Sequence, residues 1–113
     1  MADSTVLHQL MAVIEDRKRN PPARSYTTKL FAGGVELIGD KIIEEAAEVV
    51  EAAREIGDEG RRHMIAEAGD LMYHLFVMLG HLDIRLDEVE SELARRFGIS
   101  GIDEKAARPP KAD

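Results

Sequence analysis

The chain has 113 residues, enough for one helical domain whose core needs no disulfide or structural metal to hold it together. Its 44% of hydrophobic residues, its 33% of charged residues and its formal net charge of -7 exclude a disordered polyelectrolyte and a basic nucleic-acid binder. Because the net charge is negative, long-range electrostatics would repel polyphosphates, and an anionic substrate would need a cation to mediate its binding.

We expect neither export nor membrane insertion from this sequence. It lacks cysteine, which excludes disulfides and thiol catalysis and is compatible with a reducing cytosol. The opening MADSTVLHQL has neither the basic start nor the apolar centre of a signal peptide. The most apolar stretch, LMYHLFVMLGHL at 71–82, contains two histidines and is too short to cross a bilayer. We expect a soluble, cytoplasmic protein that binds neither membranes nor nucleic acid.

The first predicted helix begins at Asp3 as its capping residue. Apolar residues recur at helical spacing over 6–14, a basic turn follows, and two prolines then stop the helix. Ser25 could cap a short helical segment, YTTKLFA, which Gly33 and Gly34 interrupt.

A long helix is predicted from about Val35 to Ile56, because apolar residues repeat every three or four positions and a glycine follows as a plausible stop. GDEG at 57–60 is interpreted as the turn. A third helix then covers roughly 61–82, and a fourth, LDEVESELARRFG, ends at Gly98.

No strand-like alternation is present, and short connections favour antiparallel neighbours. We therefore predict a single all-α domain over residues 1–113, an antiparallel bundle of about four helices with a loosely held polar tail from about residue 99.

Five carboxylates interrupt this helical pattern. The segment EEAAE contains three of them, Glu44, Glu45 and Glu48. The segment EAGD contains the other two, Glu67 and Asp70. At about 100° per residue, Glu45 falls at the edge of the buried face of its helix, one turn from Glu48. Glu67 and Asp70 lie in an otherwise apolar run, where ionised acids are rarely left unpaired.

Two arrangements of these acids remain open. On solvated helix faces, like charges one turn apart cost only a few tenths of a kcal/mol. If the two acidic strips face each other instead, charges about 5 to 6 Å apart repel by roughly 3 kcal/mol per pair at an effective dielectric near 20, and only a bound cation makes that tolerable. Oxygen ligands without cysteine suit Mg²⁺ or Mn²⁺.

The histidines do not extend this set into a di-iron site. Such a site needs a glutamate followed three residues later by a histidine on two helices, and the sequence has no such pair. His74 is interpreted as a hydrogen-bonded structural residue, and His63 and His81 as solvated.

The order EEAAE followed by EAGD resembles the all-α, MazG-type nucleoside polyphosphate pyrophosphohydrolases. SYTTKLFAGG at 25–34 and DLMYHLFVML at 70–79 narrow the resemblance to the phosphoribosyl-ATP pyrophosphatases of histidine biosynthesis, over nearly the whole chain. The chain departs from that pattern at Ile43, where glycine is usual, at Gly69, where alanine is common, and in a longer turn before the third helix. These departures spare the acids.

The resemblance implies a set of site residues. The magnesium ligands would be Glu44, Glu45, Glu48, Glu67 and Asp70, with Glu45 or Glu48 as the general base. Lys29 and Lys41 match positions that could contact phosphates, although a solvated lysine is an equal alternative for each. The substrate side would include the segment of Ser25, Tyr26 and Thr27.

The implied reaction is Mg²⁺-dependent hydrolysis of phosphoribosyl-ATP to phosphoribosyl-AMP and pyrophosphate by a homodimer, for which the apolar face of the first helix offers a surface. Two alternatives stay open. One is a relative on the same fold that hydrolyses (deoxy)nucleoside triphosphates, and the other is a non-catalytic helical dimer whose acids are only surface.

Overall fold

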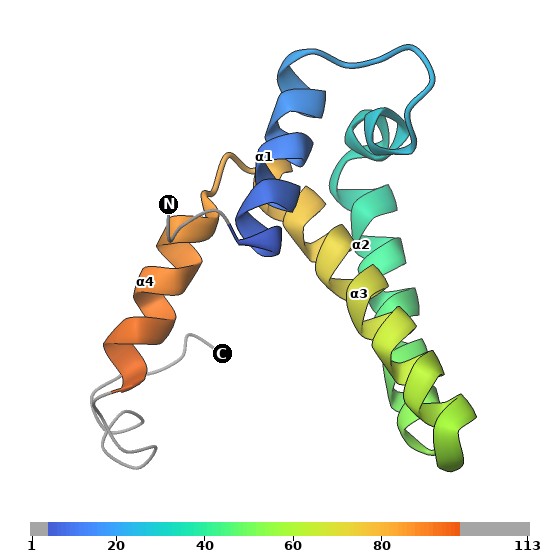
Figure 1. Ribbon diagram of the computed structural model, residues 1–113. Helices are drawn as coiled ribbons and strands as arrows, with labels where there is room; N and C mark the ends of the chain where they lie inside the picture. Colours follow the sequence, from blue (N-terminus) through green and yellow to red (C-terminus); the bar gives the residue numbers. More distant parts are fainter. Residues whose placement is uncertain (1–4, 98–113) are drawn as a thin grey trace, which may run out of the picture.

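The protein is all-α in the computed structural model, which describes residues 5–97 (Figure 1). The described residues form four helices and no strand, which confirms the predicted fold class. The helices are α1 (Val6–Arg19), α2 (Tyr26–Ala53), α3 (Gly57–His81) and α4 (Leu86–Phe97). The predicted cap at Asp3 and the predicted loose tail lie outside the described residues. None of these four helices is long and apolar enough to span a membrane.

Helix α1 is fixed at both ends. Its N-cap is Thr5, whose hydroxyl accepts a hydrogen bond from the backbone N–H of His8 at 3.2 Å. Near its other end, the Lys18 ammonium donates to the carbonyls of Gly80 at 3.0 Å and His81 at 3.1 Å. Because the last carbonyls of a helix lack partners within it, this lysine satisfies the end of α3 and ties α1 to it.

Helix α2 contains the predicted interruption as a kink. Gly34 has φ 67° and ψ -160°, a left-handed backbone that glycine adopts without strain, so the short predicted segment and the long predicted helix are joined there. The first turns of α2 are seen almost end-on in Figure 1, whereas the rest of the helix runs along α3. The kink therefore folds the start of α2 back over the hairpin that α2 and α3 form.

The hairpin turn differs from the prediction. Helix α2 ends at Ala53 rather than at Ile56, and α3 begins at Gly57 rather than near residue 61. Ile56 is an extended N-cap, and Gly57 turns the chain with φ 77°. GDEG is thus the first turn of α3, where its two acids lie favourably at the positive end of the helix dipole.

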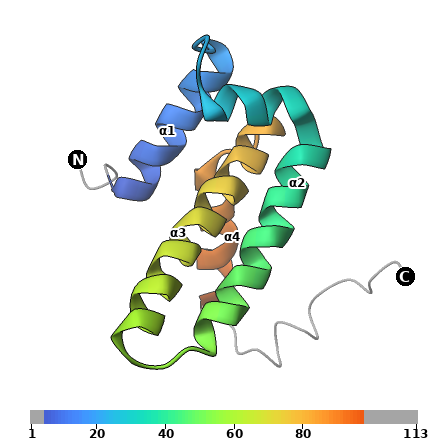
Figure 2. The same ribbon diagram turned by 90° about the vertical axis from the view of Figure 1, so that its right-hand side faces the viewer.

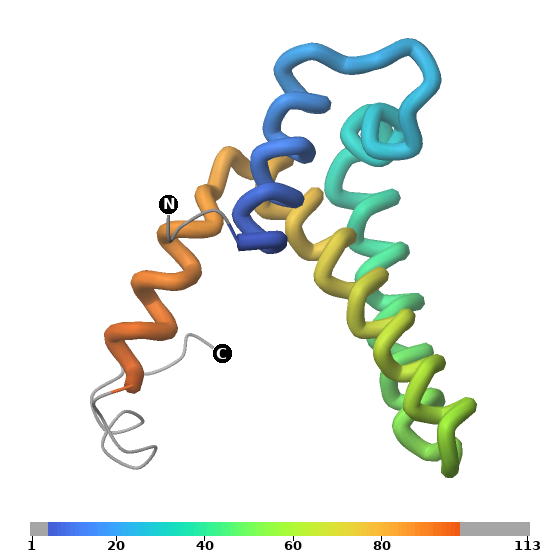
Figure 3. The backbone as a smooth tube through the Cα atoms, viewed as in Figure 1, coloured from blue at the N-terminus to red at the C-terminus, as the bar shows by residue number. Residues whose placement is uncertain are grey.

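The core lies where α1 and the kinked end of α2 pack on the C-terminal half of α3. Its buried residues come from all four helices, namely Met11, Ile14, Leu30, Ile38, Phe76, Val77 and Leu86. Figure 2 shows α1 beside this half of α3, and Figure 3 shows α4 leaving the hairpin at an angle. The other half of the hairpin, toward its turn, is covered by no other described helix. That uncovered half carries the predicted acids.

Candidate metal centre and active site

Three of the five predicted metal ligands meet between α2 and α3. Glu45 on α2 and Glu67 and Asp70 on α3 each offer one carboxylate oxygen, and these oxygens lie within 4.8 Å of one another. The antiparallel hairpin brings the two acidic strips together, because its short turn aligns one helix with the other. Of the two arrangements open from the sequence, the structure has the facing one.

Burial makes this cluster unfavourable without a cation. One oxygen of Glu45 and one of Glu67 are buried with no hydrogen-bond partner among the described residues. The Glu67 side chain is only 14% exposed. Buried carboxylate oxygens are normally paired, and leaving them unpaired costs free energy. Three converging carboxylates with two unpaired oxygens fit a hard divalent cation such as Mg²⁺.

Glu48 lies beside the cluster. The Glu67 carboxyl, close enough to share a hydrogen bond with it, raises the pKa of the Glu48 carboxyl, and the charge of Glu67 adds to this effect. A carboxylate with a raised pKa is a better proton acceptor than an ordinary one. This is the property that a general base at the edge of the cluster would need.

Glu44 is not one of the three acids whose oxygens converge. Its side chain is 53% exposed and lies 3.7 Å from the ammonium of Lys41, one turn earlier on α2. The structure therefore pairs Glu44 with Lys41 and does not bring Glu44 into the group of converging oxygens.

His63 is partly solvated, as predicted, since 37% of its side chain is exposed, but it also contacts two acids. One ring nitrogen lies 2.8 Å from Glu55, and the other lies 3.3 Å from Glu67. The hydrogen bond with Glu55 raises the pKa of the His63 imidazole, which favours its cationic form next to the acids. His81 also differs from the prediction, because its ring stacks on Phe31 at a centroid distance of 6.3 Å.

Tyr26 reaches over α3 from the first turn of α2. The Nδ1 atom of His74 lies 2.9 Å from the backbone carbonyl of Asp70, and a carbonyl can only accept, so Nδ1 carries the proton. In the neutral ring Nε2 is then an acceptor, and the Tyr26 hydroxyl, 2.9 Å away, donates to it. His74 is buried, as expected for a structural histidine, and it links Tyr26 to the backbone of an acid in the cluster.

The charges that act on the Tyr26 hydroxyl include those of two of the acids. Burial raises the pKa of the Tyr26 hydroxyl, the charge of Lys41 opposes this, and the charges of Glu44 and Glu45 reinforce it. Its ring also stacks on Tyr73, with centroids 6.3 Å apart. Tyr26 thus forms one border of the acidic site.

The neighbours of Tyr26 make internal contacts. Ser25 is buried and caps α2, since its Oγ accepts from the N–H of Thr28 at 3.2 Å. Thr27 is also buried, and its hydroxyl bonds to that of Tyr73. Both side chains hold the start of α2 against α3. Lys29, by contrast, is exposed on the same turn.

Comparison with known proteins identifies the family to which this arrangement belongs. The family model for phosphoribosyl-ATP pyrophosphohydrolase matches residues 7–97, which include every one of the predicted site residues. The chain belongs to the phosphoribosyl-ATP pyrophosphohydrolase family.

Individual phosphoribosyl-ATP pyrophosphatases agree with this assignment. The chain is 54% identical to the one from Rhodopirellula baltica over 107 residues, which are 95% of this chain and 89% of that protein. It is 49% identical to the one from Rhodobacter capsulatus, over 92% of this chain and 98% of the relative. It is 42% identical to the one from Azoarcus sp. strain BH72, over 96% and 98% respectively.

A second group of ligand-type residues in this family member has a structural explanation. His8 on α1 lies 3.3 Å from Asp87 and 3.1 Å from Glu90 on α4. These contacts are hydrogen bonds between exposed side chains, and they tie the start of α4 to α1. Unlike the cluster of Glu45, this group leaves no buried oxygen without a partner in the described residues.

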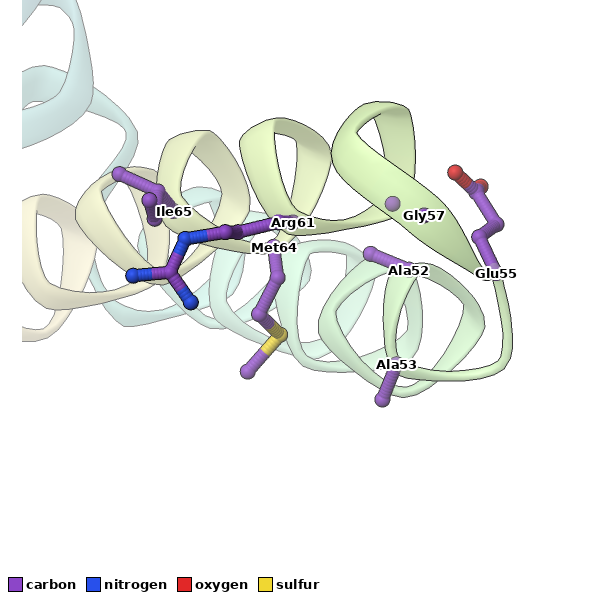
Figure 4. A pocket seen from close by; sticks show the side chains of 8 residues that line it. Ala52, Ala53, Glu55, Gly57, Arg61, Met64 and Ile65 are labelled. Atoms are coloured by element: carbon purple, nitrogen blue, oxygen red, sulfur yellow. The ribbon is translucent and has the colours of Figure 1, made fainter.

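A cavity of about 350 Å³ lies at the hairpin turn (Figure 4). Small and apolar residues such as Ala52 and Met64 line it together with the charged residues Glu55 and Arg61. It contains none of the predicted site residues. Ile65 is 62% exposed.

Two features of the site were not found from the sequence. The bond from Tyr26 to His74 joins residues far apart in the chain, and only the direction of the kink at Gly34 brings them together. Arg24, which shares a cavity with Tyr26 and Lys29, was not singled out at all. A cation directly before the helix cap at Ser25 was the signal that could have identified it.

Proposed function

We propose that this protein hydrolyses the α,β-phosphoanhydride of phosphoribosyl-ATP, giving phosphoribosyl-AMP and pyrophosphate, a step of histidine biosynthesis. The observation that carries the proposal is the convergence of Glu45, Glu67 and Asp70 in a chain that matches this family over residues 7–97. Such a step in amino-acid biosynthesis also favours a cytoplasmic location.

The cluster would hold Mg²⁺, with Mn²⁺ as a possible substitute, through oxygens of Glu45, Glu67 and Asp70. When bound, the ion would offset the negative charge of the phosphates and polarise them for attack by water. The unpaired buried oxygens of Glu45 and Glu67 support this role, because they have no other partner among the described residues.

The remaining residues would position water and substrate. Glu48 is our choice for the base that takes a proton from the attacking water, since it borders the cluster without being one of the three converging ligands and has a raised pKa. Lys41, paired with Glu44 at the rim, could turn to a phosphate oxygen. No covalent nucleophile is needed, because water attacks and pyrophosphate leaves.

We also propose that the active form is a homodimer. Apolar side chains on the uncovered half of the hairpin are widely exposed, with Ile43 at 71%, Val50 at 51% and Ile65 at 62%. Ile43 and Val50 are seven residues apart and therefore share one face of α2. An exposed apolar face of this kind on two neighbouring helices is typical of a subunit interface. Sedimentation velocity should show a dimer, and a monomer at micromolar concentration would contradict this part of the proposal.

The test of the function is pyrophosphate release. Phosphoribosyl-ATP, ATP and the deoxynucleoside triphosphates should be compared at equal concentration, each with Mg²⁺ and with excess chelator. We expect phosphoribosyl-ATP to be the best substrate, no release in chelator, and recovery when Mg²⁺ is restored. Faster release from deoxynucleoside triphosphates would replace the proposed substrate, and full turnover in chelator would remove the metal from the mechanism.

A further inference from the structure

A cavity of about 360 Å³ lies beside the start of α2, outside the acidic cluster. It is lined by Ala23, Arg24, Ser25, Tyr26 and Lys29. Its walls thus combine two cations with an aromatic ring. Its size falls within the range of small-molecule sites in proteins.

The two cations have no internal partner. Among residues 5–97, neither the Arg24 guanidinium nor the Lys29 ammonium has an ion pair or a hydrogen bond, and both residues are exposed. Some other cations among the described residues are paired, for example Lys18 with Asp83 at 2.9 Å. Exposed lysines and arginines are commonly only solvated, but these two share one cavity. An anion there would meet two positive charges and no competing carboxylate on the cavity wall.

Tyr26 connects this cavity with the acidic cluster. Tyr26 lines the cavity, and its hydroxyl is hydrogen-bonded to His74 at 2.9 Å. The charges of Glu44 and Glu45 contribute to the raised pKa of this hydroxyl. The side chain is held in place and yet is 49% exposed, so part of the ring is available to a ligand. Any nucleobase can stack on such a ring, because every base has a flat π face. A ligand with an anion in the cavity and phosphates at the acids would pass across Tyr26.

We propose that Arg24 and Lys29 bind the phosphate of the phosphoribosyl group, and that this contact distinguishes phosphoribosyl-ATP from ATP. The inference rests on the proposed function, since only that substrate has a phosphorylated ribose attached to its adenine in addition to the triphosphate. The guanidinium of Arg24 can grip a phosphate through two parallel hydrogen bonds, and Lys29 adds a second charge. The adenine lies along Tyr26, and the triphosphate reaches the acids.

The test uses the product, which keeps the phosphoribosyl phosphate and lacks the pyrophosphate. Calorimetric titration in excess chelator compares phosphoribosyl-AMP with AMP, so the result depends on neither metal nor turnover. The wild-type protein should bind phosphoribosyl-AMP roughly tenfold or more tightly than AMP, as expected for charge-assisted hydrogen bonds to one phosphate. In Arg24→Gln and in Lys29→Gln this ratio of affinities should fall toward one.

Arg54→Gln is the matched control. Arg54 is an exposed arginine at the opposite end of α2, so its replacement removes the same charge at a distance from the cavity. This variant should keep the wild-type ratio. If all three variants lower the ratio equally, net charge is responsible and the cavity is not a phosphate site. If neither cavity variant changes it, the inference is wrong as well.

Hydrolysis assays separate this inference from the proposed function. If the wild-type protein releases pyrophosphate from phosphoribosyl-ATP but Arg24→Gln keeps the wild-type preference over ATP, only the cavity assignment fails. If the wild-type protein does not hydrolyse phosphoribosyl-ATP at all, the proposed function fails, and the assignment of the cavity fails with it. A higher KM for phosphoribosyl-ATP with little change in kcat in Arg24→Gln would support the assignment, because the contact is remote from the reacting bond.

Discussion

Replacing Glu67 with Gln should stabilise the metal-free protein, although it removes a proposed metal ligand. The substitution keeps the size of the side chain and deletes the charge at the centre of the cluster. In the native chain, the ligand oxygen of Glu67 lies within 4.8 Å of those of Glu45 and Asp70. Without a bound cation, the charge of Glu67 therefore repels its two neighbours and destabilises the fold.

The magnitude follows from that distance. Two like unit charges 4.8 Å apart repel by roughly 1 kcal/mol in water and about 3 kcal/mol at an effective dielectric near 20. Glu67 is mostly buried, whereas Asp70 is exposed and better screened. The substitution also removes the contact between Glu67 and His63, at 3.3 Å, and this loss offsets about 0.2 to 1 kcal/mol of the gain in stability. We expect Glu67→Gln to raise the free energy of unfolding by about 1 to 3 kcal/mol in chelator.

Urea unfolding at one protein concentration measures this change, with and without Mg²⁺. Magnesium should stabilise the wild-type protein, by about 2.7 kcal/mol at one hundred times its dissociation constant, and should stabilise Glu67→Gln much less. Glu51→Gln, the same change at an exposed position of α2, is the control and should stay within about 0.5 kcal/mol of wild type. A less stable Glu67→Gln protein with an unchanged magnesium shift would refute the reasoning.

Four further predictions concern two glycines, a surface carboxylate and the base. Gly69→Ala should raise the free energy of unfolding by about 0.5 to 1 kcal/mol, because alanine favours a helix and a Cβ there meets no atom within 4 Å. Gly60→Ala should lower it, because its Cβ would lie 2.7 Å from the carbonyl oxygen of Glu55; the two urea midpoints test both signs. Hydrogen bonds from two arginines lower the pKa of Glu92 to about 2. The stabilising effect of the Glu92 carboxylate should therefore be complete above pH 4.5 and be lost as the pH falls toward 2. An NMR titration midpoint near 4.5 for Glu92 would show that its pairs with the arginines do not persist in solution. Glu48→Gln should nearly abolish pyrophosphate release without lowering the melting temperature in chelator, and retained turnover would exclude Glu48 as the base.

The acidic centre could be predicted from the sequence because it depends on local geometry. Rotation by about 100° per residue put Glu45 at the edge of the buried face of its helix, and the structure buries one of its oxygens. A short turn between two helices then sufficed to predict that the strips could face each other.

Features that depend on the backbone angles at a turn or kink could not be predicted from the sequence. The sequence pattern assigns Gly57 to the end of one helix. In the structure Gly57 has φ 77° and is the first residue of the next helix, a role that glycine can serve equally well. The kink at Gly34 was expected, but its direction was not, and that direction brings Tyr26 to His74. The contacts of α4 with His8 likewise join residues far apart in the chain, and helical periodicity does not indicate them.

Locating the metal directly tests the central claim, that the carboxylates of Glu45, Glu67 and Asp70 hold the ion that hydrolysis requires. Substoichiometric Mn²⁺ should be added to the isotope-labelled protein while NMR follows the loss of amide signals through paramagnetic relaxation. We expect signals around these three acids to broaden first and to recover when Mg²⁺ is added in excess. First broadening around His8 and Asp87 at the contact between α1 and α4, or broadening with no preferred position, would contradict the claim.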